Sequence, residues 1–251
     1  MMKLFFLVGS VARPARTPTR TVSSCVLRSA LAAAAIGAAL GVSAAFTACV
    51  QNSQAQKDKP AELREWKGEA LDSISKFQEN SIAGPQRISL AKYHLAVTGL
   101  VAKPMAYTYE QVLAHPSTAR VVTLRCVEGW DVKALWEGVV IKDLLAEAEV
   151  KPEATTVIFK CYDGYSTSAP VDYIMKKDVL LVYKVNGLTL PPARGYPLAL
   201  LAEDKWGYKS ARWVTTIELS NNPKFRGYWE SRGYNNNGDL SGPMFENERR
   251  R

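Results

Sequence analysis

The chain has 251 residues, of which 47% are hydrophobic and 22% charged, as in an ordinary globular protein. Its formal charge of +8 overstates the basicity of the folded part, because residues 1–48 hold five basic side chains and no acidic one. The remainder carries 27 basic and 24 acidic residues. No basic block with interleaved aromatic residues occurs, so the composition argues against a nucleic-acid partner.

The few cysteines and histidines exclude several common metal and haem sites. Cys25 lies within residues 1–48 and Cys49 follows them directly, so the folded part keeps Cys126 and Cys161. There is no Cys-x-x-Cys-His haem motif and no cysteine–histidine spacing typical of zinc. The two remaining cysteines could pair in an exported protein, and the sequence does not decide this. No histidine stands beside a cysteine, which argues against a cysteine-nucleophile hydrolase.

Residues 1–48 have the pattern of an export signal: basic residues, an alanine-rich run over residues 29–46, and small residues at the end. The run is close to the length of a membrane span, so a retained anchor is the alternative. Residues 46–49 (FTAC) approximate a lipoprotein cleavage box, which predicts a lipid on Cys49; simple cleavage nearby is the alternative. Residues 49–61 are polar and indicate a flexible tether.

The first predicted elements precede the central motif. Residues 62–77 carry apolar side chains at helical spacing and predict a helix. Residues 93–101 alternate loosely between apolar and polar and predict a strand. A capping box at residues 108–111 predicts a short helix that ends near residue 115.

The strongest chemical signal lies in residues 121–145. A β-branched run at residues 121–124 predicts a strand with Arg125 and Cys126 at its end, then a loop over residues 127–130 and an amphipathic helical pattern. A thiol in this position can be a small core residue, the common fate of a free cysteine. It can also be a thiolate stabilised by a neighbouring cation or metal. The pattern alone leaves both interpretations open.

Further elements follow in order. Residues 155–162 predict an apolar strand with a turn after it, and residues 171–175 predict a helical turn. Residues 179–190 predict a hairpin with Asn-Gly at its tip. Residues 205–213, rich in Gly, Lys, Ser and Arg, predict either a phosphate-binding loop or a solvated basic loop. A strand at 214–219 and an aromatic, turn-rich segment that packs over the domain complete the pattern.

Several of these segments resemble a known family. The motifs are RCVEGW at residues 125–130, WEGV at residues 136–139, GYK at residues 207–209 and RW at residues 212–213. Together they are similar to the sulfite-oxidase-like molybdopterin oxidoreductases, above all to short single-domain bacterial members akin to the catalytic subunit of periplasmic methionine sulfoxide reductase. The resemblance spans about residues 65–239. It implies a mixed, β-rich α+β fold in one domain over residues 62–242. Residues 243–251, which end in three arginines, predict a disordered tail.

The resemblance also implies a cofactor and its ligands. A molybdenum ion would be held by a pterin dithiolene and by Cys126, and Glu128 would lie near the metal as an acceptor or proton relay. The implied cofactor-binding positions are Asn80, Arg125, Cys126, Cys161, Arg194, Lys209, Ser210, Ala211 and Arg212.

Each assignment has a plainer alternative. Glu128 could be a surface loop carboxylate, Cys161 a core thiol, and Asn80 an ordinary turn residue. Asp163 and Tyr165 could line the mouth of the substrate site or merely form a turn.

The implied activity is oxygen-atom transfer by an exported enzyme. Its substrate would be a small oxo-acid or a sulfoxide-type compound, and its electrons would pass through a separate cytochrome or membrane partner. A thiolate is a soft ligand that suits a transition metal. Reductase-type relatives carry Asn and Arg where this chain has Arg194 and Ala199, and the leader lacks the Arg-Arg pair of a twin-arginine signal. These departures motivate the alternative of a non-catalytic, surface-tethered binding lipoprotein on the same scaffold.

Overall fold

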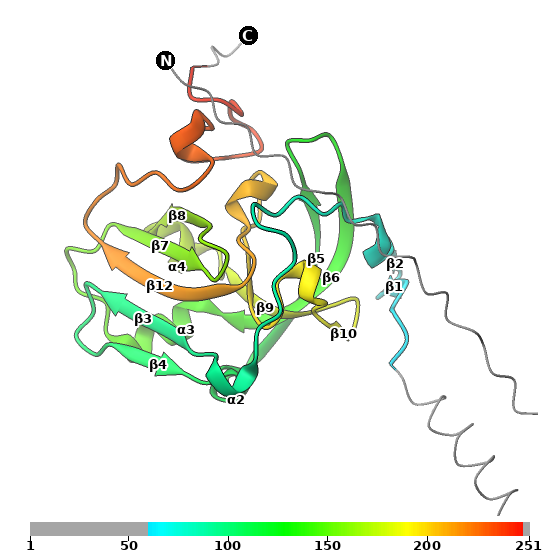
Figure 1. Ribbon diagram of the computed structural model, residues 1–251, viewed down its shortest axis with the longest axis horizontal. Helices are drawn as coiled ribbons and strands as arrows, with labels where there is room; N and C mark the ends of the chain where they lie inside the picture. Colours follow the sequence, from blue (N-terminus) through cyan, green and yellow to red (C-terminus); the bar gives the residue numbers. More distant parts are fainter. Residues whose placement is uncertain (1–59, 248–251) are drawn as a thin grey trace, which may run out of the picture. The chain divides into compact units, whose positions relative to one another are not determined.

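Two five-stranded β-sheets organise residues 60–247, the part of the chain that the computed structural model describes (Figure 1). The expected leader with Cys49, and residues 248–251, lie outside the described residues. Within residues 60–247, no helix is both long and apolar enough to span a membrane. The predicted class, a mixed and β-rich α+β fold, is confirmed.

The first sheet is antiparallel and is built around the longest hairpin of the described chain. It comprises β5 (Ser117–Arg125), β6 (Asp131–Val140), β9 (Leu180–Val185), β10 (Leu188–Thr189) and β11 (Ala199–Leu201). The strand order is β10-β9-β6-β5, and β11 pairs with β9. Strands β5 and β6 pair without a break from Ser117↔Val139 to Arg125↔Asp131, which fixes the turn between them at residues 126–130.

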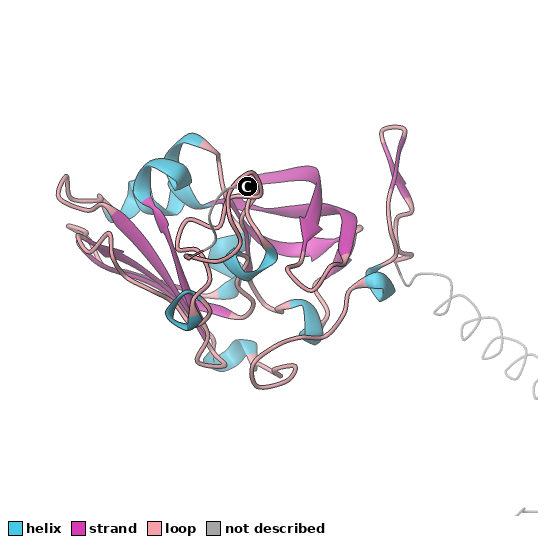
Figure 2. Ribbon diagram, turned by 90° about the horizontal axis from the view of Figure 1, so that it is seen from above, coloured by secondary structure: helices cyan, strands magenta, loops and turns pink. Residues whose placement is uncertain are grey.

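The second sheet has the order β4-β3-β12-β7-β8 and contains one parallel pair, β3 with β12. Its strands are β3 (Leu95–Gly99), β4 (Met105–Tyr107), β7 (Thr156–Cys161), β8 (Ser166–Pro170) and β12 (Val214–Ser220). Seen from above, the strands of these two sheets form separate groups joined by loops and short helices (Figure 2). The largest hydrophobic cluster takes buried residues from both sheets.

Three short α-helices connect the strands: α2 (Tyr109–Leu113), α3 (Ile141–Ala148) and α4 (Val171–Lys176). The capping box of α2 is confirmed, since the side chain of Thr108 accepts from the N–H of Gln111 and that of Gln111 accepts from Thr108. Helix α3 buries Ile141, Leu144, Leu145 and Ala148, which is the spacing of one helical face.

Five 3₁₀ helices complete the fold of the described residues. They are η1 (Ile74–Lys76), η2 (Leu90–Lys92), η3 (Pro192–Arg194), η4 (Gly207–Lys209) and η5 (Glu230–Arg232). The predicted hairpin over residues 179–190 is confirmed as β9–β10, and both tip residues, Asn186 and Gly187, have positive φ angles as a tight hairpin turn requires.

The helix predicted over residues 62–77 is wrong. This segment forms the hairpin β1 (Glu65–Trp66) and β2 (Glu69–Ala70), followed by η1. Lys67 and Gly68 adopt left-handed backbone angles, φ 50° and 83°, which reverse the chain and cannot occur inside a right-handed helix.

The expected disordered tail is also wrong in part, because its first residues are paired. The N–H of Asn235 donates to the carbonyl of Met244 at 2.9 Å, and that of Glu246 donates to the carbonyl of Gly233 at 3.0 Å. The ring of Phe245 lies 4.9 Å from that of Tyr234. Residues 243–247 therefore belong to the folded domain.

Candidate functional site

The turn between β5 and β6 presents Cys126. The N–H of Cys126 donates to the carbonyl of Trp130 at 2.9 Å, and the N–H of Gly129 donates back to the carbonyl of Cys126 at 3.1 Å. Gly129 has φ 86°, a left-handed angle that glycine adopts without strain. The five-residue turn holds the thiol where a strand ends, as the sequence predicted.

The turn between β7 and β8 has the same construction. The N–H of Cys161 donates to the carbonyl of Tyr165 at 3.0 Å, and the N–H of Gly164, at φ 84°, donates to the carbonyl of Cys161 at 3.1 Å. The carboxylate of Asp163 accepts from the N–H of Tyr165 at 3.0 Å. The hydroxyl of Tyr165 donates to the carbonyl of Tyr208.

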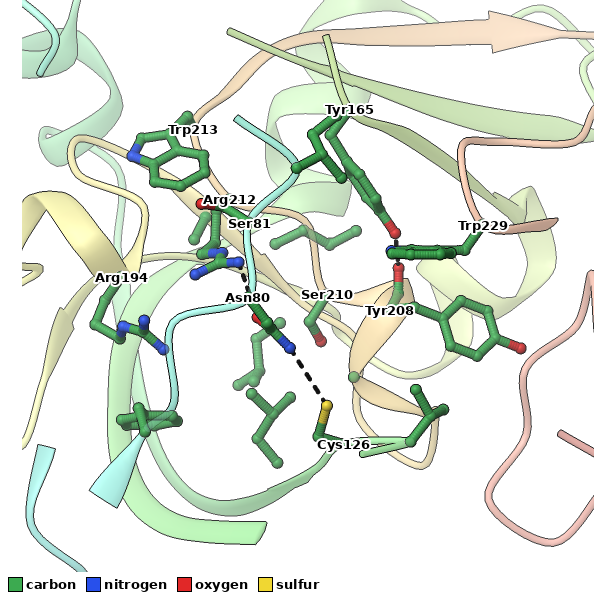
Figure 3. Close-up of a pocket in the computed structure, with 18 of the residues that line it drawn as sticks. Asn80, Ser81, Cys126, Tyr165, Arg194, Tyr208, Ser210, Arg212, Trp213 and Trp229 are labelled. Carbon is green, nitrogen blue, oxygen red and sulfur yellow. Dashed lines mark hydrogen bonds between the residues drawn. The ribbon is translucent and has the colours of Figure 1, made fainter. Parts of the chain in front are cut away.

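Both turns contribute residues to one cavity, which encloses about 140 Å³ of space. Its lining includes the carboxyl groups of Glu128 and Asp163 and, from the same two turns, the rings of Trp130 and Tyr165. In Figure 3 the two arginines and Trp213 lie on one side of Asn80 and Cys126, and Tyr165, Tyr208 and Trp229 lie on the other.

Asn80 connects the thiol to the rest of the site. Its Nδ2 lies 3.5 Å from Sγ of Cys126 and donates to Oε2 of Glu128 at 3.1 Å. Its Oδ1 accepts from a guanidinium nitrogen of Arg212 at 3.0 Å. The Glu128 carboxylate also accepts from Nε1 of Trp130 at 3.1 Å. One amide therefore orients both the cysteine and the carboxylate.

The environment of Cys126 does not by itself produce a thiolate. The side chain is only 7% exposed. Burial raises the pKa of the Cys126 thiol; the Glu128 carboxylate adds to this rise, and the N–H of Glu128 and the Asn80 amide oppose it. The neighbouring Arg125 is exposed and lies outside the cavity lining. A thiolate here therefore depends on a bound metal, which deprotonates a coordinating thiol.

Arg194 and Arg212 lie on the cavity wall and share one carboxylate. A guanidinium nitrogen of Arg194 donates to Oε2 of Glu79 at 2.7 Å, and one of Arg212 donates to the same oxygen at 3.1 Å. Burial raises the pKa of Glu79, but hydrogen bonds from Ser81 and the two arginines outweigh it and lower that pKa overall. The carboxylate is therefore ionised at neutral pH.

Not every predicted ligand faces the cavity. The structure brings Asn80, Cys126, Glu128, Asp163, Tyr165, Arg194, Ser210 and Arg212 together in its lining. The side chains of Arg125, Cys161, Lys209 and Ala211 lie outside it. That these four positions bind the cofactor, through side chain or backbone, stays a prediction.

These side chains lie outside the lining for different reasons. Ala211 is 1% exposed in the hydrophobic core, and Cys161 is buried there as a free thiol. Lys209 is 2% exposed, and its Nζ donates to Oε1 of Glu230 at 2.6 Å and to the carbonyl of Asn236 at 2.9 Å. The ammonium charge of Lys209 is therefore paired with a carboxylate inside the protein.

The family follows from the comparison with known proteins. Residues 82–229, more than half of the chain, match the family described as the oxidoreductase molybdopterin binding domain. The chain belongs to this family. It is therefore a molybdopterin-binding oxidoreductase, and its cofactor is molybdenum-pterin.

Its relatives include several bacterial proteins. It is 35% identical over 158 residues to the uncharacterized oxidoreductase YuiH of Bacillus subtilis, a match covering 62% of this chain and 78% of the relative. It is 33% identical over 150 residues to the putative protein-methionine-sulfoxide reductase subunit YedZ1 of Azospira oryzae, covering 60% and 57%. It is 32% identical over 143 residues to the catalytic subunit MsrP of Gluconobacter oxydans, covering 50% and 46%.

A solved structure supports the fold. The sulfane dehydrogenase SoxCD of Paracoccus pantotrophus superposes with a TM-score of 0.55 and 25% identity, covering 60% of this chain and 42% of that one. The oxidoreductase spans about half the length of the methionine-sulfoxide reductase relatives that it matches.

The donor set of the cavity fits this cofactor. Among residues 60–247, no three His, Cys, Asp or Glu side chains converge on a metal position. The cavity instead offers one thiol, Cys126, which suits a soft metal whose other ligands come from the cofactor itself. A metalloenzyme built only from side chains would need more ligands than the site provides.

Sequence reasoning missed part of the wall. Tyr208, Trp229 and Tyr234 line the cavity, and Glu79 joins the two arginines. The aromatic segment near the C-terminus was expected only to pack over the domain. Its richness in Trp and Tyr was the available signal, since these side chains combine an apolar ring with a polar group.

Proposed function

We propose that this oxidoreductase is an exported enzyme of oxygen-atom transfer. It acts on a small oxo-acid or a sulfoxide-type compound, and it exchanges electrons with a separate protein. The observation that carries the proposal is the single thiol of Cys126 in a cavity where Asn80 orients it against Glu128.

Each residue has a role in this reaction. When bound, molybdenum-pterin supplies the oxygen-transfer and redox chemistry. Cys126 holds the metal, and Asn80 keeps the thiol and the Glu128 carboxylate in register. Reduction of a sulfoxide consumes two electrons and two protons and releases a thioether and water. Glu128 is placed to hold one of these protons, and the partner protein supplies the electrons.

The partner and the location are supported by relatives and by the leader. Two relatives are described as a subunit and a catalytic subunit of protein-methionine-sulfoxide reductases, names that imply further subunits. Residues 1–48 have the pattern of an export signal, with Cys49 as a lipidation position. A cytochrome or membrane protein is the partner that we propose. Cell fractionation and lipid labelling of wild type and Cys49→Ala test the location; protein that stays cytoplasmic would contradict it.

Metal analysis tests the proposal directly. The full chain is produced in a host that makes the cofactor, and molybdenum is measured per chain. We expect stoichiometric molybdenum in wild type and in Cys161→Ser, the matched control thiol, and a large loss in Cys126→Ser. Unchanged loading of Cys126→Ser would overturn the proposed role of this residue.

The alternative, a non-catalytic binding lipoprotein, was suggested by Arg194 and Ala199. Both residues line the cavity, and Arg194 places its guanidinium group on the wall. The arginine charge of the reductase-type relatives is therefore supplied here from position 194 instead of position 199, and it stays in the cavity wall. This favours an enzyme over a non-catalytic binding protein. A fully loaded protein that reacts with no electron donor or acceptor would favour the lipoprotein.

A further inference from the structure

The wall formed by Arg194 and Arg212 looks suited to an anion, but the protein already occupies it. Arg194 is 9% exposed and Arg212 18% exposed at the side chain. Besides Glu79, Arg194 donates to the carbonyl of Gln78 at 3.1 Å. Arg212 also donates to the carbonyl of Ala193 at 3.1 Å. Both guanidinium groups are therefore hydrogen-bonded to acceptors of the protein itself.

The carboxylate of Glu79 is fixed from both oxygens. Oε2 accepts from the two arginines, and Oε1 accepts from the N–H of Ser81 at 2.9 Å and from its hydroxyl. Its position between the guanidinium groups is therefore set by a local turn of the segment that also carries Asn80. Charge-assisted hydrogen bonds of this kind are among the strong ones in proteins.

The cavity has no surplus positive charge. Its lining has two cationic side chains, Arg194 and Arg212, and two carboxyl groups, those of Glu128 and Asp163. Glu79 adds a third carboxylate behind the arginines. An incoming anion would meet no net attraction, and a site without that attraction does not concentrate anions.

The opposite wall is aromatic. Tyr165, Tyr208 and Trp229 lie across from the arginines (Figure 3), and their rings suit an apolar substituent rather than a hydrated anion. An uncharged oxo compound with carbon substituents fits both walls, whereas a small oxyanion fits neither.

We propose that Glu79 determines substrate specificity: by occupying both guanidinium groups, it excludes anionic oxo compounds and leaves the cavity selective for uncharged ones. This inference rests on the proposed oxygen-transfer function and narrows its substrate class. It is a case of specificity by exclusion, because the same two arginines without Glu79 would form an oxyanion site.

Binding of sulfate, an unreactive oxyanion, tests the role of Glu79 without turnover. Sulfate affinity is measured by calorimetry on the loaded full chain, for wild type, Glu79→Gln and a control, Glu218→Gln. Glu218 is 30% exposed against 34% for Glu79, and it pairs with Lys160 outside the cavity lining. We expect Glu79→Gln to bind sulfate at least about tenfold more tightly, with an affinity that falls as ionic strength rises. The control should match wild type.

A second variant tests whether the gained sulfate affinity comes from the two arginines. Glu79→Gln combined with Arg194→Gln should lose the gained sulfate affinity, because one of the two cations is gone. Unchanged sulfate affinity in Glu79→Gln would overturn the proposal. So would a gain seen only in cofactor-free protein, since the arginines would then be covered by the phosphate of the cofactor. If Glu79→Gln does not load the cofactor, Glu79→Asp in loaded protein takes its place, with a smaller gain expected and no gain overturning the proposal.

Turnover measurements distinguish the proposed role of Glu79 from the proposed oxygen-transfer function on which it rests. With an artificial electron donor, we expect sulfate to inhibit turnover of dimethyl sulfoxide in Glu79→Gln and to leave the turnover of wild type and Glu218→Gln unaffected. Loaded wild type that transfers oxygen with no substrate would contradict the proposed function. The sulfate affinities would still report the role of Glu79.

Discussion

The turns at Cys126 and Cys161 share one pattern and differ in chemistry. Each runs Cys-x-acid-Gly-aromatic, each closes with the same two backbone hydrogen bonds, and each glycine has a positive φ. In both turns the acidic and aromatic residues line the cavity. Of the two thiols, however, Cys126 lines the cavity and Cys161 does not. Cys126 meets the amide of Asn80, whereas Cys161 packs in the hydrophobic core.

The difference shows what a local motif can and cannot specify. The turn determines where a thiol emerges from a strand, but the segment that packs against it determines whether it faces a cavity. Burial raises the pKa of both thiols. Only Cys126, however, has a polar cavity beside it in which a metal can replace the proton.

The largest expected effect comes from breaking the support that both turns share. Helix η4 lies against both turns. Trp206, the residue before the helix, forms a β-bridge with Arg125, next to the first turn. The carbonyl of Tyr208 in the helix accepts a hydrogen bond from the hydroxyl of Tyr165 in the second turn. The buried Lys209–Glu230 pair holds η4 in place. Glu230→Gln leaves an unpaired buried ammonium group, so the free energy of unfolding should fall by about 3–5 kcal/mol.

Urea unfolding measures this loss. The control is Glu218→Gln, whose partner Lys160 is half exposed, and its cost should stay below about 1 kcal/mol. Equal losses in the two variants would show that burial does not decide the strength of these pairs.

The next largest effect separates the two thiols themselves. Cys161→Ser places a hydroxyl in the apolar core and should cost about 1–3 kcal/mol of unfolding free energy. Cys126→Ser should cost less than about 1 kcal/mol, because Asn80 and Glu128 remain as partners for the hydroxyl. Stability therefore ranks the variants in the opposite order from molybdenum content. Thermal unfolding of the cofactor-free proteins checks this, and a larger loss in Cys126→Ser would contradict the comparison.

These cysteines also show how far the sequence could predict the site. The strand and turn at Cys126, the capping box of α2 and the hairpin β9–β10 depend on neighbouring residues, and their patterns predicted them. The resemblance of short motifs predicted the family and the cofactor.

Long-range pairings were beyond the sequence. Glu79 pairs with Arg194 and Arg212, which are 115 and 133 residues away in the sequence. Lys209 pairs with Glu230, and no local sequence pattern indicates that these two segments pack together. Lys209 and Arg212 stand in one loop, so composition treats them alike. Which of the two reaches the cavity depends on the tertiary fold.

A smaller effect should be equal in the two turns. Gly129 and Gly164 have φ angles of 86° and 84°, and a Cβ at either would meet nothing within 4 Å. Gly129→Ala and Gly164→Ala should each cost about 1–2 kcal/mol from backbone strain alone. The double variant should be additive within about 0.5 kcal/mol, as for independent sites. Denaturant unfolding tests this; a strongly unequal pair would show that one turn carries strain that the other lacks.

The smallest expected effect is a pH dependence from the acidic residue of the second turn. Burial raises the pKa of Asp163 above its ordinary value of 3.8, against the N–H donors of the turn and Arg212. The folded protein therefore binds this proton more tightly than the unfolded chain, so ionised Asp163 destabilises the fold above its folded pKa. Asp163→Asn should be more stable than wild type at neutral pH. The difference should shrink as pH falls through the folded pKa and vanish only below the ordinary value of 3.8. Asp72→Asn is the control with the opposite sign, because the N–H of Lys133 and the ammonium group of Lys76 lower the pKa of Asp72. That variant should be less stable than wild type at neutral pH, and this difference should also fade in acid. Thermal unfolding from about pH 2 to 8 compares the three proteins. The same sign in both variants would show that burial of Asp163 in the cavity wall does not govern its ionisation.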